Sequence, residues 1–93
     1  MKMHNKKANT QAIEKLYQLI SSIETEEDCK LLFEDLCTIK EIEQMAQRVK
    51  AAQLLIEGKT YTQVIEECDI SSATLSRVSR CVQYGNGYNK FLK

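Results

Sequence analysis

The sequence predicts an all-α protein with five to six helices, two of which form a helix-turn-helix. Its 93 residues contain no proline and only three glycines, so few turn-forming residues interrupt the chain. Sustained period-2 alternation of β-branched residues, which marks strands, is absent. Apolar residues instead recur three and four positions apart, the spacing of one helix face. A chain of this length forms one domain at most. We expect a flexible tail at residues 1–9 and a single helical domain at 10–93.

Two helices are expected before residue 38. The first runs from about Thr10 to Ile23 along an apolar stripe, and Thr25 can cap the second. The second helix carries a wide apolar arc of Leu31, Leu32, Phe33, Leu36 and Cys37. Such an arc fits burial against a second copy in an intertwined dimer, and it fits a central place in a monomer core equally well. Domains of this size bury a modest share of their surface, so oligomerisation is a natural supplement.

A long third helix is expected next. Thr38 and Glu41 have the spacing of a capping box, in which side chain and backbone bond reciprocally at a helix start. Apolar residues then keep helical spacing to about Glu57, and Gly58 is suited to ending the helix.

Residues 60–83 have the pattern of a helix-turn-helix. Thr60 and Gln63 form a second capping box, and either Ser71 or Ser72 can cap the helix that follows. Asp69 falls in the turn, where we expect an unusual backbone conformation that Asp tolerates better than most residues. On spacing alone, an ordinary helical hairpin is the alternative.

The second helix of this pair has an apolar side and an outward side of small polar residues and arginines. The side chains expected to be buried are Leu75, Val78, Cys81 and Val82. Because the second helix of such a motif enters the major groove, small polar residues followed by arginines suit base edges and phosphates. The candidate DNA-binding residues are Thr62, Ser71, Ser72, Ala73, Thr74, Ser76, Arg77 and Arg80, with Lys59 as a further phosphate contact.

The C-terminal segment is basic although the formal net charge of the chain is +0. Residues 71–93 hold four basic residues and no acid, while most acids lie between Glu24 and Asp69. A basic segment beside a helix-turn-helix suits phosphate neutralisation. Within the segment, we expect residues 84–88 to form a flexible hinge with left-handed backbone and residues 89–93 to form a helical turn.

Other classes of function find little support. The four cysteines include no CxxC pair and the single histidine, His4, lies in the tail, so neither a zinc site nor another cofactor is expected. No nucleophile–histidine pair or glycine-rich phosphate loop is present, which argues against an enzyme. The absence of a signal peptide and of a membrane-length apolar run predicts a cytoplasmic protein with reduced thiols and no membrane partner.

From about Leu16 onward the chain resembles the Trp repressor superfamily, and within it the Trp-repressor-related branch of uncharacterised bacterial proteins. The matching segments are residues 36–41, 47–49, 54–59 and 72–77, and the Gly-Asn-Gly-Tyr run at 85–88 points to that branch. The resemblance implies a six-helix fold in which two chains interlock through their N-terminal helices. Two-fold symmetry would place two recognition helices about one DNA turn apart, on a near-palindromic target.

The resemblance also implies an effector pocket. The tryptophan-sensing repressor of this superfamily binds its ligand between two arginines, which Arg48 and Arg77 match, and Thr38 matches a residue lining the same pocket. Val78 stands where the sensing repressor has glycine and should occupy the space of the indole ring. Tryptophan binding is therefore not expected, and any small-molecule effector is left unidentified. Without a ligand, Arg48 would pair with a glutamate of its own helix and Arg77 would contact phosphate only.

These observations predict a homodimeric, sequence-specific DNA-binding regulator of transcription, of the repressor type, that does not respond to tryptophan. The alternative is a protein-interaction module on a repressor-like scaffold. The neutral net charge favours this alternative, as do Asp69, where such motifs often have Gly, and Ile65, where they usually have Ala.

Overall fold

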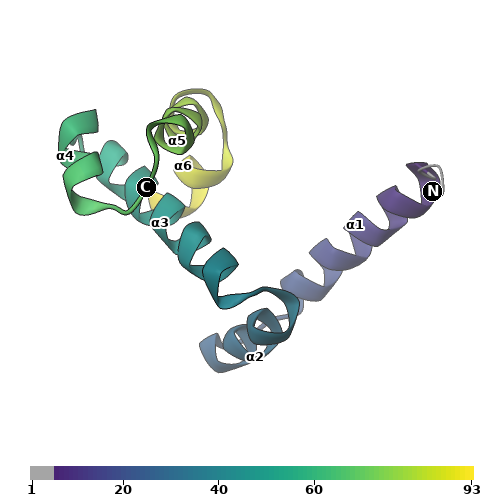
Figure 1. Ribbon diagram of the computed structural model, residues 1–93. Helices are drawn as coiled ribbons and strands as arrows, with labels where there is room; N and C mark the ends of the chain where they lie inside the picture. The colour runs from purple at the N-terminus through teal and green to yellow at the C-terminus, as the bar shows by residue number, and fades with distance from the viewer. Residues whose placement is uncertain (1–5) are drawn as a thin grey trace, which may run out of the picture. The chain divides into compact units, whose positions relative to one another are not determined.

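The computed structural model describes residues 6–93 and, in that range, contains six α-helices and no strand, as the sequence predicts (Figure 1). The helices are α1 Lys6–Ser21, α2 Glu26–Leu36, α3 Ile39–Ile56, α4 Tyr61–Glu67, α5 Ser72–Tyr84 and α6 Gly87–Leu92. They belong to two compact units, one with α1 and α2, up to residue 36, and one with α3 to α6, residues 37–93. Each unit is described by itself.

The first helix begins earlier than the sequence predicts. It starts at Lys6 instead of about Thr10, so residues 6–9 of the expected flexible tail are helical. Thr10 does not cap the helix, because its hydroxyl donates to the Lys6 carbonyl one turn back, at 2.8 Å. The rest of the expected tail, residues 1–5 with His4, lies outside the described residues.

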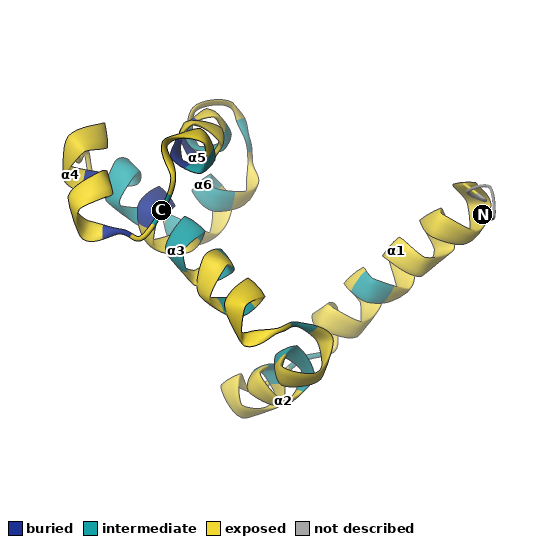
Figure 2. Cartoon of the chain, in the orientation of Figure 1, coloured by how far each residue is buried: buried dark blue, intermediate teal, exposed yellow. Residues whose placement is uncertain are grey.

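The apolar stripes of the first unit are exposed or at most half-buried. Neither α1 nor α2 contains a buried residue, and Figure 2 shows no dark blue on either helix. Tyr17 and Leu31 are 64% and 60% exposed. Local signals nevertheless form α2 as predicted, since Thr25 Oγ1 accepts from the Asp28 N–H at 3.0 Å. α1 and α2 are therefore regular helices that have no buried core of their own.

Hydrogen bonds at both ends fix the length of α3, as the sequence predicts. Thr38 Oγ1 accepts from the Glu41 N–H at 3.1 Å, and the Thr38 N–H donates to Glu41 Oε1 at 2.8 Å. The Thr38 backbone N–H, which donates to the carboxylate, and after it the Thr38 side chain hold the pKa of Glu41 below its ordinary value. At the other end, Gly58 has a φ of 95°, and the N–H groups of residues 58 and 59 donate to the carbonyls of residues 55 and 54. This Schellman motif requires the left-handed conformation that glycine adopts without strain.

The core of the second unit is centred on two alanines of α3. Ala51 and Ala52 are both 0% exposed, and α4 and α5 pack around them. The largest fully buried side chains are Val64 from α4 with Leu75 and Val78 from α5. Figure 2 shows buried segments in dark blue on α3, α4 and α5. Burying each such side chain contributes about 1.5–3 kcal/mol, so this small cluster dominates the packing of the unit.

The helix-turn-helix consists of α4, α5 and the turn between them, residues 60–84. Both caps are as predicted: Thr60 and Gln63 form a capping box, and Ser71 is the N-cap of α5. The expectation of an unusual backbone conformation at Asp69 is wrong, because no non-glycine residue among those described has a positive φ. The turn is instead bounded by extended residues, with Cys68 at φ −119°, ψ 145° and Ser71 at φ −74°, ψ 157°.

The connection between α5 and α6 is hydrogen-bonded and has no left-handed residue, contrary to expectation. Asn89 Nδ2 donates to the carbonyls of Val82 and Gly85, at 2.8 and 3.0 Å. Gly85 is extended, and a Cβ there would lie 2.7 Å from the Cys81 carbonyl oxygen. The glycine at 85 is thus required by close approach of two backbone segments, and α6 already begins at Gly87.

Alanine substitution at the three glycines tests these requirements. Gly58→Ala should lower the free energy of unfolding by about 1 kcal/mol, because a Cβ is strained at positive φ. Gly85→Ala should cost at least as much, on the order of 1–3 kcal/mol, since the Cys81 backbone must shift. Denaturant titrations followed by circular dichroism measure both changes.

Gly87→Ala is the matched control. Its Cβ would meet nothing within 4 Å and its φ is not positive. It should be neutral, or stabilising by up to about 1 kcal/mol through the unfolded chain. A ranking in which Gly87→Ala is the most damaging variant would contradict the backbone geometry described above.

Candidate nucleic-acid interface

The residues of α5 separate by face as the sequence predicts, except that Cys81 and Val82 are half-buried and Ser79 is buried. Leu75 and Val78 are each 1% exposed and belong to the core with Ala51 and Ala52. On the other side, the exposed residues include Ser72, Ala73, Ser76, Arg77 and Arg80. At 3.6 residues per turn these five positions span an arc of about 140°, which is one side of the helix. We call this set the outward face of α5.

The remaining predicted DNA-binding residues lie at the start of the two helices. Ser71 Oγ accepts from the Thr74 N–H at 3.1 Å and donates to Thr74 Oγ1 at 2.9 Å. These bonds tie both hydroxyls to the first turn of α5, so Thr74 is half-buried instead of fully outward. Thr62 and Lys59 are exposed, in the first turn of α4 and just before it.

The electrostatics of the outward face favour an anion. All charged side chains of α5 and α6 are basic, namely Arg77, Arg80 and Lys90. The N-terminus of α5 adds the partial positive charge of its free N–H groups. The acids of the preceding segment, Glu66, Glu67 and Asp69, lie at the end of α4 and in the turn.

A polar cavity of about 290 Å³ lies where α3 meets the turn and the start of α5. Its lining residues are Gln44, Gln47, Arg48, Asp69, Ile70, Ser71 and Thr74. Within residues 6–93 Arg48 has no ion pair, so the expected alternative of pairing with a glutamate of its own helix is not observed. Two of those glutamates have other partners, since Glu41 bonds to Thr38 and Glu57 accepts from Gln53.

The structure does not gather the four predicted effector-pocket residues into one cavity. Arg48 lines the polar cavity, whereas Thr38 caps α3 and Arg77 is exposed. Val78 is 1% exposed within the apolar core. No described cavity takes in both arginines together with Val78.

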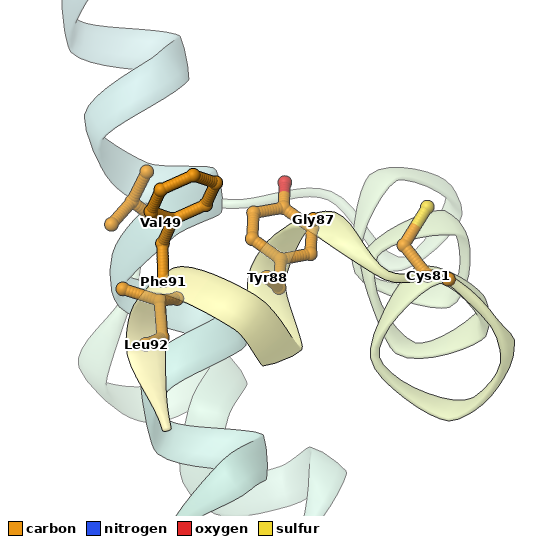
Figure 3. Close-up of a pocket in the computed structure, with 7 residues that line it drawn as sticks. Val49, Cys81, Gly87, Tyr88, Phe91 and Leu92 are labelled. Atoms are coloured by element: carbon orange, nitrogen blue, oxygen red, sulfur yellow. The ribbon is translucent and has the colours of Figure 1, made fainter.

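A second, apolar cavity of about 420 Å³ opens between α3, α5 and α6. It is lined by Val49, Cys81, Gly85, Gly87, Tyr88, Phe91 and Leu92. Figure 3 shows the Tyr88 ring between Cys81 of α5 and the Val49–Phe91 side of the cavity. Phe91 is 79% exposed and Val49 is 47% exposed, so this apolar wall faces outward. We call it the α3–α6 groove.

The described residues contain no group of three or more side chains that could hold a metal ion. The four cysteines are unpaired, and Cys68 is buried. None of the helices within residues 6–93 is sufficiently long and apolar to span a bilayer.

A sequence model of the family described as "Trp repressor protein" matches residues 11–93. This chain belongs to the Trp repressor family. The match confirms the resemblance noted at residues 36–41 and 72–77, and membership of the family indicates a DNA-binding regulator.

Relatives agree with this assignment. Uncharacterised protein YerC from Bacillus subtilis (strain 168) is 46% identical over 74 residues, which is 80% of this chain and 71% of YerC. A Trp repressor candidate from Staphylococcus aureus, known from a crystal structure, is 37% identical in sequence to this chain. The two structures match with a TM-score of 0.83 over 98% of this chain and 92% of that chain. A TrpR-like protein from Eubacterium eligens ATCC 27750 is 44% identical, with a TM-score of 0.81 over 92% and 90% of the two chains. The all-α fold is therefore one that solved relatives share.

Two residues that bear on the interface could not be found from the sequence. Gln47 Oε1 accepts from the Asp69 N–H at 3.0 Å, and Lys50 Nζ donates to the Glu67 carbonyl at 2.9 Å. Both residues are on α3, and their partners lie 22 and 17 positions further along the chain. A polar residue on a long helix carries no signal of such a partner, because the fold alone brings the two segments together.

Proposed function

We propose that this protein is a sequence-specific DNA-binding regulator of transcription, of the repressor type, that acts as a homodimer. The observation that carries the proposal is the outward face of α5. Its small polar residues and two arginines are exposed on a helix whose opposite side is anchored by Leu75 and Val78. A helix held in this way can enter the major groove without exposing its core.

The outward face divides into base-contacting and phosphate-contacting positions. Ser72, Ala73 and Ser76, together with Thr74, are short side chains in the first two turns of α5, where base edges come within reach. Arg77 and Arg80 follow toward the C-terminal half of α5, and their long side chains suit phosphate oxygens. Lys59 and Thr62 would add phosphate contacts from the start of α4.

A second copy of this chain is the partner that best accounts for the exposed apolar surface. α1 and α2 bury no residue, and the α3–α6 groove leaves Phe91 and Val49 open. Among residues 6–93, the buried apolar core is limited to six residues, all in the second unit. Chains of this size with so small a core commonly gain stability by association. A two-fold dimer would present two α5 helices to a near-palindromic site.

The proposed regulator does not respond to tryptophan. Val78 is part of the closed apolar core, and Arg48 and Arg77 do not share a cavity. The proposal includes no catalytic step, and any effector would have to be chemically different from an indole amino acid.

A protein-interaction module on the same scaffold is the alternative. The neutral net charge and the exposed aromatic residues Tyr84 and Phe91, at 81% and 79%, favour it. Titration of random duplex DNA at low ionic strength separates the two proposals. Absence of any association would favour the interaction module, because phosphate neutralisation is strongest at low salt.

Arg80→Ala should weaken binding to all duplexes and lower the slope of log K against log salt by about 1 per chain. Arg80 is exposed, so the fold should be unaffected. Fluorescence anisotropy at several salt concentrations measures the slope, and Lys40→Ala is a control for loss of one positive charge on α3. Unchanged affinity and slope in Arg80→Ala would exclude a phosphate contact there.

By contrast, Ser72→Ala should change which DNA sequence is preferred.

Association of folded chains should make the melting temperature rise with protein concentration. Mass action favours the folded dimer over unfolded single chains as the concentration increases. Phe91→Asp should raise the dimer dissociation constant by about tenfold or more, since it places a charge in the α3–α6 groove. Sedimentation measures the constant. Tyr84→Asp is the control, because Tyr84 is as exposed but does not line the groove. A monomer at every concentration would contradict the proposed dimer.

Tryptophan should produce no binding heat in calorimetry at millimolar concentrations, and it should not change the affinity for DNA. Phenylalanine is the control for weak, general binding of an aromatic amino acid. Tight binding of tryptophan by the unmodified protein would show that Val78 does not close the pocket.

A further inference from the structure

We propose that Gln47 and Lys50 of α3 are positioning residues that fix the angle of the helix-turn-helix, and with it the separation of the two half-sites that the dimer accepts. The inference rests on the proposed DNA-binding function and names residues that have no DNA contact of their own. It concerns specificity for half-site spacing, not affinity for bases.

The two residues hold adjacent points of the same segment. Gln47 Oε1 accepts from the Asp69 N–H in the turn, and Lys50 Nζ donates to the Glu67 carbonyl at the end of α4. Positions 47 and 50 lie three residues apart, so they share one face of α3. Among residues 6–93, these are the side-chain hydrogen bonds that join α3 to residues 60–84. We call this pair of bonds the α3 clamp.

The chemistry of each bond suits its place. The Glu67 carbonyl is one of the last of α4, which lack partners inside the helix, and a cation is favoured at a helix C-terminus. The Asp69 N–H lies outside any helix, so it needs an acceptor from a side chain or from water. Both bonds are directional and restrict rotation of the segment, which apolar contact alone does less well.

The first helix of the motif needs such a restraint. α4 has seven residues, of which only Val64 is buried, while Tyr61 and Ile65 are 49% and 41% exposed. Val64, and Cys68 directly after the helix at 7% exposed, fix the distance from α3 but leave a rotation about the line between these two contacts soft. The clamp supplies two further fixed points at the end of α4 and in the turn, directly before α5 begins.

Small rotations there matter for DNA. The 13 residues of α5 extend for about 20 Å, so a rotation of about 10° would move its far end by about 3 Å. This displacement is close to the rise of one base pair, about 3.4 Å. Without the clamp, each α5 would reach neighbouring base pairs with similar ease, and the dimer would accept half-sites one base pair closer or further apart.

The variants Gln47→Met and Lys50→Met test the clamp. Methionine keeps an unbranched side chain of similar length and good helix propensity while removing the hydrogen-bonding group. Gln47→Glu and Lys50→Arg keep an acceptor oxygen and a donor, so they should behave as the unmodified protein. Gln53→Met and Lys40→Met are matched controls on α3. The Gln53 side chain bonds only to Glu57 on the helix surface.

The first measurement is hydrogen exchange of the Asp69 amide in the free protein. Gln47→Met should accelerate this exchange on the order of fivefold, the range expected for loss of one hydrogen bond. Gln47→Glu and Gln53→Met should leave the exchange rate of the Asp69 amide unchanged. Equal exchange rates in all variants would overturn the clamp without reference to DNA.

The second measurement uses a duplex selected from random DNA by the full chain, with one base pair then inserted or removed between its half-sites. The unmodified protein should strongly prefer the selected spacing. In Gln47→Met and Lys50→Met the ratio of dissociation constants between altered and selected spacing should fall about fivefold. A ratio removes any uniform loss of affinity caused by the missing charge of Lys50.

The outcomes are distinct. An unchanged ratio in both methionine variants overturns the proposal, as does weaker binding by one common factor at every spacing, which is the result of general destabilisation. Restoration of the ratio by Lys50→Arg supports it. If the unmodified protein binds no duplex, the proposed function itself is wrong and the spacing proposal falls with it.

Discussion

The close approach of the helix-turn-helix to α3 depends on the small size of Ala51 and Ala52. Both side chains are fully buried, and Val64, Leu75 and Val78 pack around them. A larger side chain at either position would push α4 or α5 away and open the apolar cluster, which interiors do not tolerate without strain. The short distance between α3 and the helix-turn-helix follows from this contact, and the hydrogen bonds of the α3 clamp can form only at that distance.

The chain divides its apolar surface between two uses. One part closes the core of residues 37–93. The other part, on α1, α2 and the α3–α6 groove, remains open in the single chain. The net charge of zero does not describe the outward face of α5, since α5 and α6 carry three basic residues and no acid.

Features set by neighbouring residues could be predicted from the sequence, whereas features set by the fold could not. The two capping boxes, the stop at Gly58 and the buried side of α5 follow from spacing over three or four positions. The sequence predicts a start of α1 near Thr10, which is too late, because the Thr10 hydroxyl bonds to the Lys6 carbonyl inside the helix. The role of Gly85 depends on its approach to the Cys81 carbonyl, and the clamp joins residues 17 and 22 positions apart. The effector pocket expected from the resemblance combines Thr38, Arg48, Arg77 and Val78, and none of the described cavities is lined by all four.

The backbone of the turn at Asp69 also bears on how such proteins are detected and diversify. Because no left-handed residue is needed there, position 69 is not restricted to glycine. Its N–H, not its side chain, makes the bond to Gln47, so the side chain is free to change in charge and size. A motif search that demands glycine at this turn would overlook this chain. Position 69 is accordingly a site where related proteins can accumulate substitutions while the helix-turn-helix is retained.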